Sequence, residues 1–112
     1  MKHLSIHAAA TALLLASTCA GAAVDVAKAK DLAAKNACLG CHAMATRILG
    51  PSYKEVAARY EKDKSMTVAA LGERIRAGGK GKWGAIEMPA QTGLSEADAQ
   101  ILAEWILSDP GK

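Results

Sequence analysis

Hydrophobic and polar positions recur at helical spacing in four segments of the chain. The first spans residues 25–39, where positions three or four apart define one face: Ala29, Leu32, Ala33, Asn36 and Leu39. The second begins after Gly50-Pro51, the third spans about 66–77, and the fourth runs from Ser95 to near Pro110. No segment shows the alternation with period two that marks a half-buried strand. The pattern predicts an all-α fold with about four helices.

Capping residues support the starts of these helices. The sequence Ser52-Tyr53-Lys54-Glu55 has the form of a capping box, in which a hydroxyl and a carboxylate satisfy free backbone N–H groups. Ser95 is a favourable N-cap for the last helix. The third helix ends at Gly78-Gly79, which tolerates a left-handed conformation. From Gly78 to Gly93 there are five glycines, Pro89 and no periodicity, so we expect a long ordered loop with a function.

Residues 1–23 have the organisation of a secretory signal peptide. A weakly basic start is followed by the apolar run Ala8 to Ala16 and then by small residues, so we expect cleavage after Ala22 or Ala23. An apolar core of about nine residues is too short for a membrane anchor, which needs roughly 20. Cys19 would be removed with this segment. We therefore expect residues 24–112 to form one exported, periplasmic, monomeric domain without stable membrane insertion.

The predicted mature chain is nearly balanced in charge. Its 89 residues carry 13 Lys or Arg and 11 Asp or Glu, a net charge of about +2, which is no signature of nucleic-acid binding. Four basic residues lie close together in sequence: Arg74, Arg76, Lys80 and Lys82. They suit either a solvated helix end and loop or a docking rim for an acidic partner.

Few large side chains are available for a hydrophobic core. The chain has no Phe, its aromatic residues are Tyr53, Tyr60, Trp83 and Trp105, and many of its apolar residues are Ala. Alanine buries little surface per residue. We therefore expect a flat apolar cofactor to supply part of the core.

The stretch Cys38-Leu39-Gly40-Cys41-His42 indicates which cofactor this is. In a helical turn both thiols and the imidazole lie on one side. Two thiols at this spacing can form thioethers with haem while the adjacent imidazole binds the iron. A structural zinc site needs four ligands, and the predicted mature chain offers only these three. A thioredoxin-like redox pair or a disulfide would be expected beside a βαβ pattern, which the sequence lacks.

Three methionines of the predicted mature chain are candidates for the second axial ligand. Met44 follows His42 by two residues and reaches only about 7 Å, too little to pass around the edge of the porphyrin. Met66 lies at the start of a predicted helix and suits packing. Met88 precedes Pro89 in the glycine-rich loop, 46 residues after His42. We therefore expect His42 and Met88 to ligate the iron.

Residues 24–112 resemble the class I cytochromes c, specifically the short bacterial monohaem carriers of the periplasm. The resemblance rests on the motif Cys38 to His42, on Gly50-Pro51, Trp83-Gly84 and Met88-Pro89, and on the terminal helix with Glu104-Trp105-Ile106-Leu107. It implies that the Pro51 carbonyl accepts a hydrogen bond from His42 and that the Trp83 indole donates one to a haem propionate. Directly before Met88 this chain has Ile86-Glu87, where many members of that family have a proline or valine.

By this resemblance, the chain is a soluble electron-transfer protein of the respiratory chain and not an enzyme. Its single c-type haem cycles between ferrous and ferric states, and its partners are an upstream cytochrome and an acceptor such as a terminal oxidase, a nitrite reductase or a sulfur-oxidising enzyme. A haem enzyme or gas sensor is the alternative, with Glu87 as the only acid near the distal loop. A permanent subunit of a multihaem complex is a third possibility.

Overall fold

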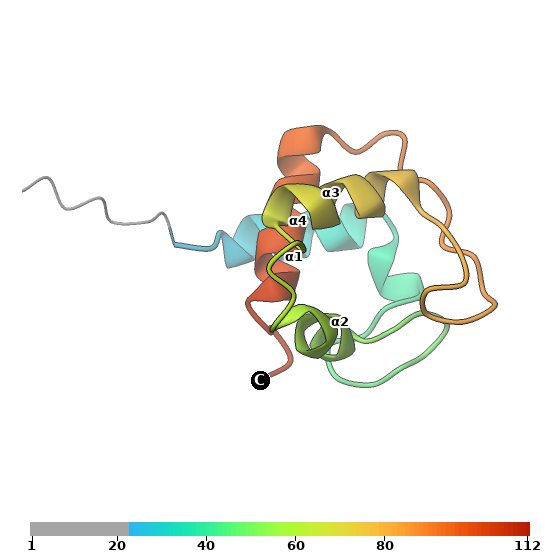
Figure 1. Ribbon diagram of the computed structural model, residues 1–112. Coiled ribbons are helices and arrows are strands. Elements are labelled where there is room, and N and C mark those ends of the chain that lie inside the picture. Colours follow the sequence, from blue (N-terminus) through green and yellow to red (C-terminus); the bar gives the residue numbers. More distant parts are fainter. Residues whose placement is uncertain (1–22) are drawn as a thin grey trace, which may run out of the picture.

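The computed structural model describes residues 23–112, which form four α-helices and one short 3-10 turn (Figure 1). The elements are α1 (Val26–Lys35), η1 (Cys38–Gly40), α2 (Tyr53–Tyr60), α3 (Val68–Ala77) and α4 (Glu96–Leu107). The all-α prediction is confirmed. Within residues 23–112, no helix is long and apolar enough to span a bilayer. The predicted signal peptide, residues 1–23, lies outside the described residues except for Ala23.

Helix α2 begins with the predicted capping box. The Ser52 hydroxyl accepts from the Glu55 N–H at 3.1 Å, and the Glu55 carboxylate accepts from the Ser52 N–H at 2.7 Å. In the same way Ser95 caps α4, since its hydroxyl accepts from the Asp98 N–H at 3.1 Å. These local hydrogen bonds fix where the two helices start.

Helix α3 begins two residues later than the sequence pattern predicted. The hydroxyl of Thr67 accepts from the Ala70 N–H at 3.1 Å and makes Thr67 the N-cap. Met66 therefore lies before the helix, and its side chain is buried in the core as expected of a packing residue. The predicted end is correct, because α3 stops at Gly78, which has a φ of 65°.

The predicted first helix, 25–39, was too long, because α1 ends at Lys35. The side-chain amide of Asn36 donates to the Leu32 carbonyl at 2.8 Å, and Ala37 adopts a left-handed conformation with φ 56°. Asn36 is a helix-terminating signal that the apolar periodicity masked. A separate turn follows, in which the His42 N–H donates to the Cys38 carbonyl at 2.9 Å. The thiols and imidazole thus share one turn, outside α1.

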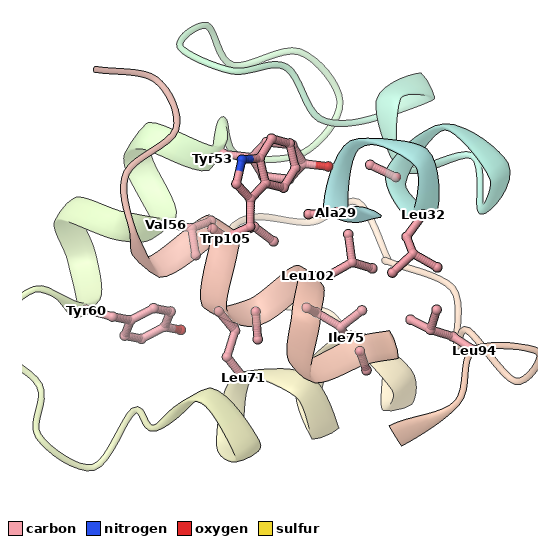
Figure 2. Close-up of a cluster of buried hydrophobic side chains, with 14 of the residues drawn as sticks. Ala29, Leu32, Tyr53, Val56, Tyr60, Leu71, Ile75, Leu94, Leu102 and Trp105 are labelled. Carbon is pink, nitrogen blue, oxygen red and sulfur yellow. The ribbon is translucent and has the colours of Figure 1, made fainter. Parts of the chain in front are cut away.

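Helix α4 packs against α1, α2 and α3 and organises the core. Helices α1 and α4 each contribute two fully buried alanines to the core: Ala29 and Ala33 from α1, Ala99 and Ala103 from α4. Alanine side chains leave room for two helix backbones to approach each other closely. Figure 2 shows Leu102 and Trp105 at the centre of the buried cluster. The core therefore lies mainly around α4, and the side formed by α2, α3 and the 78–93 loop borders a cavity.

Candidate cofactor site

A cavity of about 430 Å³ opens between η1, α2, α3, α4 and the loop after α3. Figure 1 shows these segments arranged around a common centre. The volume lies in the usual range for a small-molecule or cofactor site, roughly 300 to 1,000 Å³. All the predicted site residues line it: Cys38, Cys41, His42, Pro51, Trp83 and Met88.

The two thiols lie on the wall formed by η1. Cys38 and Cys41 are both free and half-buried. Burial raises the pKa of the Cys38 thiol; a backbone hydrogen bond opposes this effect and the nearby Cys41 adds to it. A thiol pair on one turn that faces a cavity suits attachment to two points along one edge of a flat cofactor.

The His42 imidazole is oriented by the backbone of Pro51. Its Nδ1 atom lies 2.7 Å from the Pro51 carbonyl oxygen. Because a carbonyl oxygen only accepts, this hydrogen bond requires the proton on Nδ1 and leaves a lone pair on Nε2. That tautomer is the one in which Nε2 binds a metal. The hydrogen bond from Nδ1 to the Pro51 carbonyl also fixes the orientation of the ring toward a metal bound at Nε2.

Two further residues hold the His42 ring, and sequence reasoning did not assign them this role. A Cβ atom on Gly50 would lie 2.6 Å from His42 Cε1 and 2.9 Å from Nδ1, so the ring requires glycine there. Tyr53 stacks on the imidazole, with ring centroids 5.7 Å apart and planes at 17°. Tyr53 also packs edge-on against Trp105, with ring centroids 5.2 Å apart. Through Tyr53 the imidazole is therefore connected to the core. Burial raises the pKa of the Tyr53 phenol, so it stays neutral.

Met88 reaches the same cavity from the loop after α3. Its backbone forms an isolated antiparallel bridge with Gly79. The Met88 nitrogen lies 2.8 Å from the Gly79 carbonyl oxygen, and the Gly79 nitrogen lies 2.9 Å from the Met88 carbonyl oxygen. Gly78 makes this approach possible, because a Cβ atom there would collide with the Met88 carbonyl oxygen. Neither Met44 nor Met66 lines the cavity; both pack with the hydrophobic core. Of the three candidate methionines, the structure brings only Met88 to the site.

Trp83 is half-buried and is held by aromatic and cationic neighbours. The Trp83 ring packs edge-on against Tyr60, with ring centroids 6.1 Å apart. The guanidinium carbon of Arg59 lies 4.4 Å from the centroid of the Trp83 ring. Arg47 donates to the Trp83 carbonyl at 3.1 Å. No sequence signal pointed to the two arginines, because their partners are 24 and 36 residues away along the chain.

The basic residues singled out in the sequence separate in the structure. Arg74, Lys80 and Lys82 line the cavity, as does Arg47. Arg76 instead donates to the Leu94 carbonyl and pairs with Glu73, each at 3.1 Å. Among the lining residues Glu87 is the one acid, and Ile48, Leu49 and Ile86 are exposed apolar side chains. The cavity therefore has an apolar and predominantly basic border.

The site residues define a class of protein. The paired thiols, the oriented imidazole and the thioether surround one largely apolar cavity, and these groups suit a flat metallocofactor held covalently through Cys-X-X-Cys-His. Within residues 23–112 there is no cluster of three or more His, Cys, Asp or Glu that could hold a metal ion by itself. The alternative of a structural zinc site therefore finds no support in this part of the chain.

Comparisons with known proteins agree with this class. The family model for cytochrome c matches residues 26–109. The chain is 45% identical over 78 residues to cytochrome c-552 of Nitrosomonas europaea, covering 70% of this chain and 75% of that protein. It is 44% identical over 71 residues to cytochrome c-551 of Pseudomonas aeruginosa, covering 63% of this chain and 66% of that protein.

Solved structures show the same relationship. The wild-type Nitrosomonas europaea cytochrome c552 structure aligns with a TM-score of 0.66 at 42% identity, covering 70% of this chain and 96% of that one. Class 1 cytochrome MtoD of Sideroxydans lithotrophicus aligns with a TM-score of 0.63 at 36% identity, covering 77% of this chain and 97% of that one. The chain belongs to the cytochrome c family, as a class I monohaem cytochrome c. It is an electron-transfer protein whose cofactor is covalently bound haem c.

Proposed function

We propose that this chain is a periplasmic carrier of single electrons in which His42 and Met88 would ligate the haem iron and Cys38 and Cys41 would form the thioethers that hold the haem. The observation that carries the proposal is the convergence of these four side chains on one cavity, although 46 residues separate His42 from Met88. The haem iron supplies a one-electron couple between ferrous and ferric states.

The surroundings of the site favour the ferrous form. A thioether ligand such as Met88 raises the potential of a haem iron. Much of the lining is apolar, with Leu71, Ile75 and Leu102 among its residues, and an apolar site solvates the extra charge of ferric iron poorly. The hydrogen bond from His42 to Pro51 fixes the imidazole, which limits structural change when the charge changes.

Trp83 and the basic lining residues suit the polar edge of the cofactor. The Trp83 indole N–H is a donor without acceptor capacity, and the guanidinium of Arg74 lines the same cavity. Arg74 also donates to the Tyr60 hydroxyl at 3.3 Å. We assign these donors to the carboxylates of the haem, with Trp83 as the principal one.

The exposed apolar residues Ile48, Leu49 and Ile86 suit brief docking of a redox partner at the cavity mouth. The partners we propose are an upstream cytochrome as donor and a terminal oxidase or nitrite reductase as acceptor. The predicted signal peptide, residues 1–23, supports export to the periplasm, where we expect the mature chain to act as a monomer.

Optical spectra of the purified ferric and ferrous protein test the proposal. We expect a weak red band from sulfur-to-iron charge transfer in the ferric form and no binding of carbon monoxide in the ferrous form. A ferric protein without that band, together with ready binding of carbon monoxide, would contradict the Met88 assignment. It would instead favour an enzyme or gas sensor with an open iron.

A further inference from the structure

Residues 80–87 form one side of the cavity but make few hydrogen bonds of their own. The Gly81 N–H donates to the Gly84 carbonyl at 3.0 Å, within the segment. The Gly79–Met88 bridge closes its two ends. Between residues 80–87 and the remainder of the described chain, 23–112, there are two hydrogen bonds, and both come from arginines. The polar contacts that hold this part of the loop therefore come from those two side chains, beside the apolar contact of Trp83 with Tyr60.

The two arginines bind consecutive backbone carbonyls. Arg59 donates to the Lys82 carbonyl at 2.6 Å, and Arg47 donates to the Trp83 carbonyl at 3.1 Å. Arg59 lies near the end of α2 (Tyr53–Tyr60), and Arg47 lies in the segment that follows His42. The arginine pair, Arg47 and Arg59, thus connects the His42 side of the cavity to the loop that carries Met88.

Each arginine is itself held in place. Arg47 Nε donates to Glu55 Oε1 at 3.1 Å, while the other oxygen of Glu55 accepts from the Ser52 N–H in the capping box. The Arg59 guanidinium lies 4.4 Å from the centroid of the Trp83 ring, well within the range of a cation–π contact. Arg59 therefore contacts both the backbone and the indole of this segment.

We propose that Arg47 and Arg59 are positioning residues that keep residues 80–87 closed over the haem cavity and so limit access of small ligands to the iron. The inference rests on the proposed ligation by Met88, which lies five residues after Trp83. A ligand that replaces Met88 needs the loop to move outward. That movement breaks two hydrogen bonds from charged donors, which are stronger than those from neutral donors.

Imidazole binding to the ferric holoprotein, followed by stopped-flow spectroscopy, tests this role. We expect Arg47→Gln and Arg59→Gln each to accelerate binding by about threefold and the double variant by about tenfold, because each loses a hydrogen bond that holds the loop closed. Lys35→Gln is the charge-matched control, since Lys35 pairs with Asp31 on α1 away from the cavity. A double variant that binds imidazole at the rate of the Lys35→Gln protein would overturn the proposal.

A second measurement separates positioning from charge. Arg59→Lys keeps the positive charge but loses the planar group over the indole. In the ferric protein the Trp83 indole N–H resonance depends on its distance from the iron, so we expect it to shift in this variant. The resonance of Trp105, which is buried in the core, should stay in place. An unchanged Trp83 resonance would contradict the positioning role.

The two proposals fail in different ways. A wild-type ferric spectrum without the sulfur band contradicts Met88 ligation, and the Trp83 resonance in Arg59→Lys then decides the positioning role by itself. A spectrum with the band but with unaltered imidazole rates in the double variant contradicts the role of the arginine pair alone.

Discussion

The Nδ1 atom of His42 lies 2.7 Å from the carbonyl oxygen of Pro51, nine residues further along the chain. This contact sets both the tautomer and the direction of the imidazole. It depends on Gly50, whose N–H donates to the Cys41 carbonyl at 2.7 Å and whose missing side chain leaves room for the ring.

Gly50→Ala should destabilise the holoprotein by about 1 to 3 kcal/mol, because an added methyl group 2.6 Å from the His42 ring must displace the ring or the backbone. Thermal unfolding and the reduction potential measure the effect. Gly93→Ala is the matched control, since a Cβ atom there meets nothing within 4 Å. Equal stability of the two variants would show that the ring adjusts freely.

Gly78→Ala should weaken the placement of Met88 and reduce the ferric sulfur band. The φ of 65° is strained for alanine, and the new Cβ atom would collide with the Met88 carbonyl oxygen; we expect a loss of about 1 to 3 kcal/mol. Gly81→Ala is the comparison, because Gly81 has a φ of 88° but open space around it. If both variants behave alike, backbone strain alone explains the loss.

Met88→Ala should retain haem but open the iron, which lowers the potential and admits carbon monoxide or cyanide. Potentiometry and ligand titration give the result. Met66→Ala, in the buried core, should cost about 2 to 5 kcal/mol of stability and leave the ferric sulfur band in place. A band that survives in Met88→Ala and disappears in Met66→Ala would move the axial ligand to Met66.

Haem should remain with the chain through acid–acetone extraction and denaturing electrophoresis, because two thioethers from Cys38 and Cys41 hold it. The double variant Cys38→Ala/Cys41→Ala provides the control and should release haem under the same treatment. Free extraction from the unmodified protein would refute the assignment of these thiols.

The mature chain should not fold without haem. A flat cofactor that buries about 400 Å² of apolar surface contributes on the order of 10 kcal/mol at about 25 cal/mol per Å², comparable to the whole stability of a small domain. The Cys38→Ala/Cys41→Ala variant, stripped of haem, should show weak helical circular dichroism and poorly dispersed amide signals. Cooperative thermal unfolding of that apo chain would instead mean that the packing of Leu32, Ile101 and Trp105 suffices.

The sequence by itself determined those features that depend on neighbours three or four residues apart. The capping box at Ser52, the start of α4 after Ser95, the end of α3 at Gly78 and the shared turn of Cys38 and His42 are of this kind. Each is specified by a local hydrogen bond or a local backbone preference, so the pattern alone predicts it. The predicted end of the first helix, at residue 39, was wrong because Asn36 stops the helix while the apolar spacing continues.

Tertiary structure decided which distant groups surround the cavity. It brought Arg59 to the carbonyl of Lys82 and Arg47 to the carbonyl of Trp83, it stacked Tyr53 on the His42 ring, and it separated Arg76 from the other basic residues. These contacts join segments that have no periodic relationship in the sequence. They exist only because α4 packs against three other helices and thereby fixes where each loop returns, a relationship that no local preference encodes.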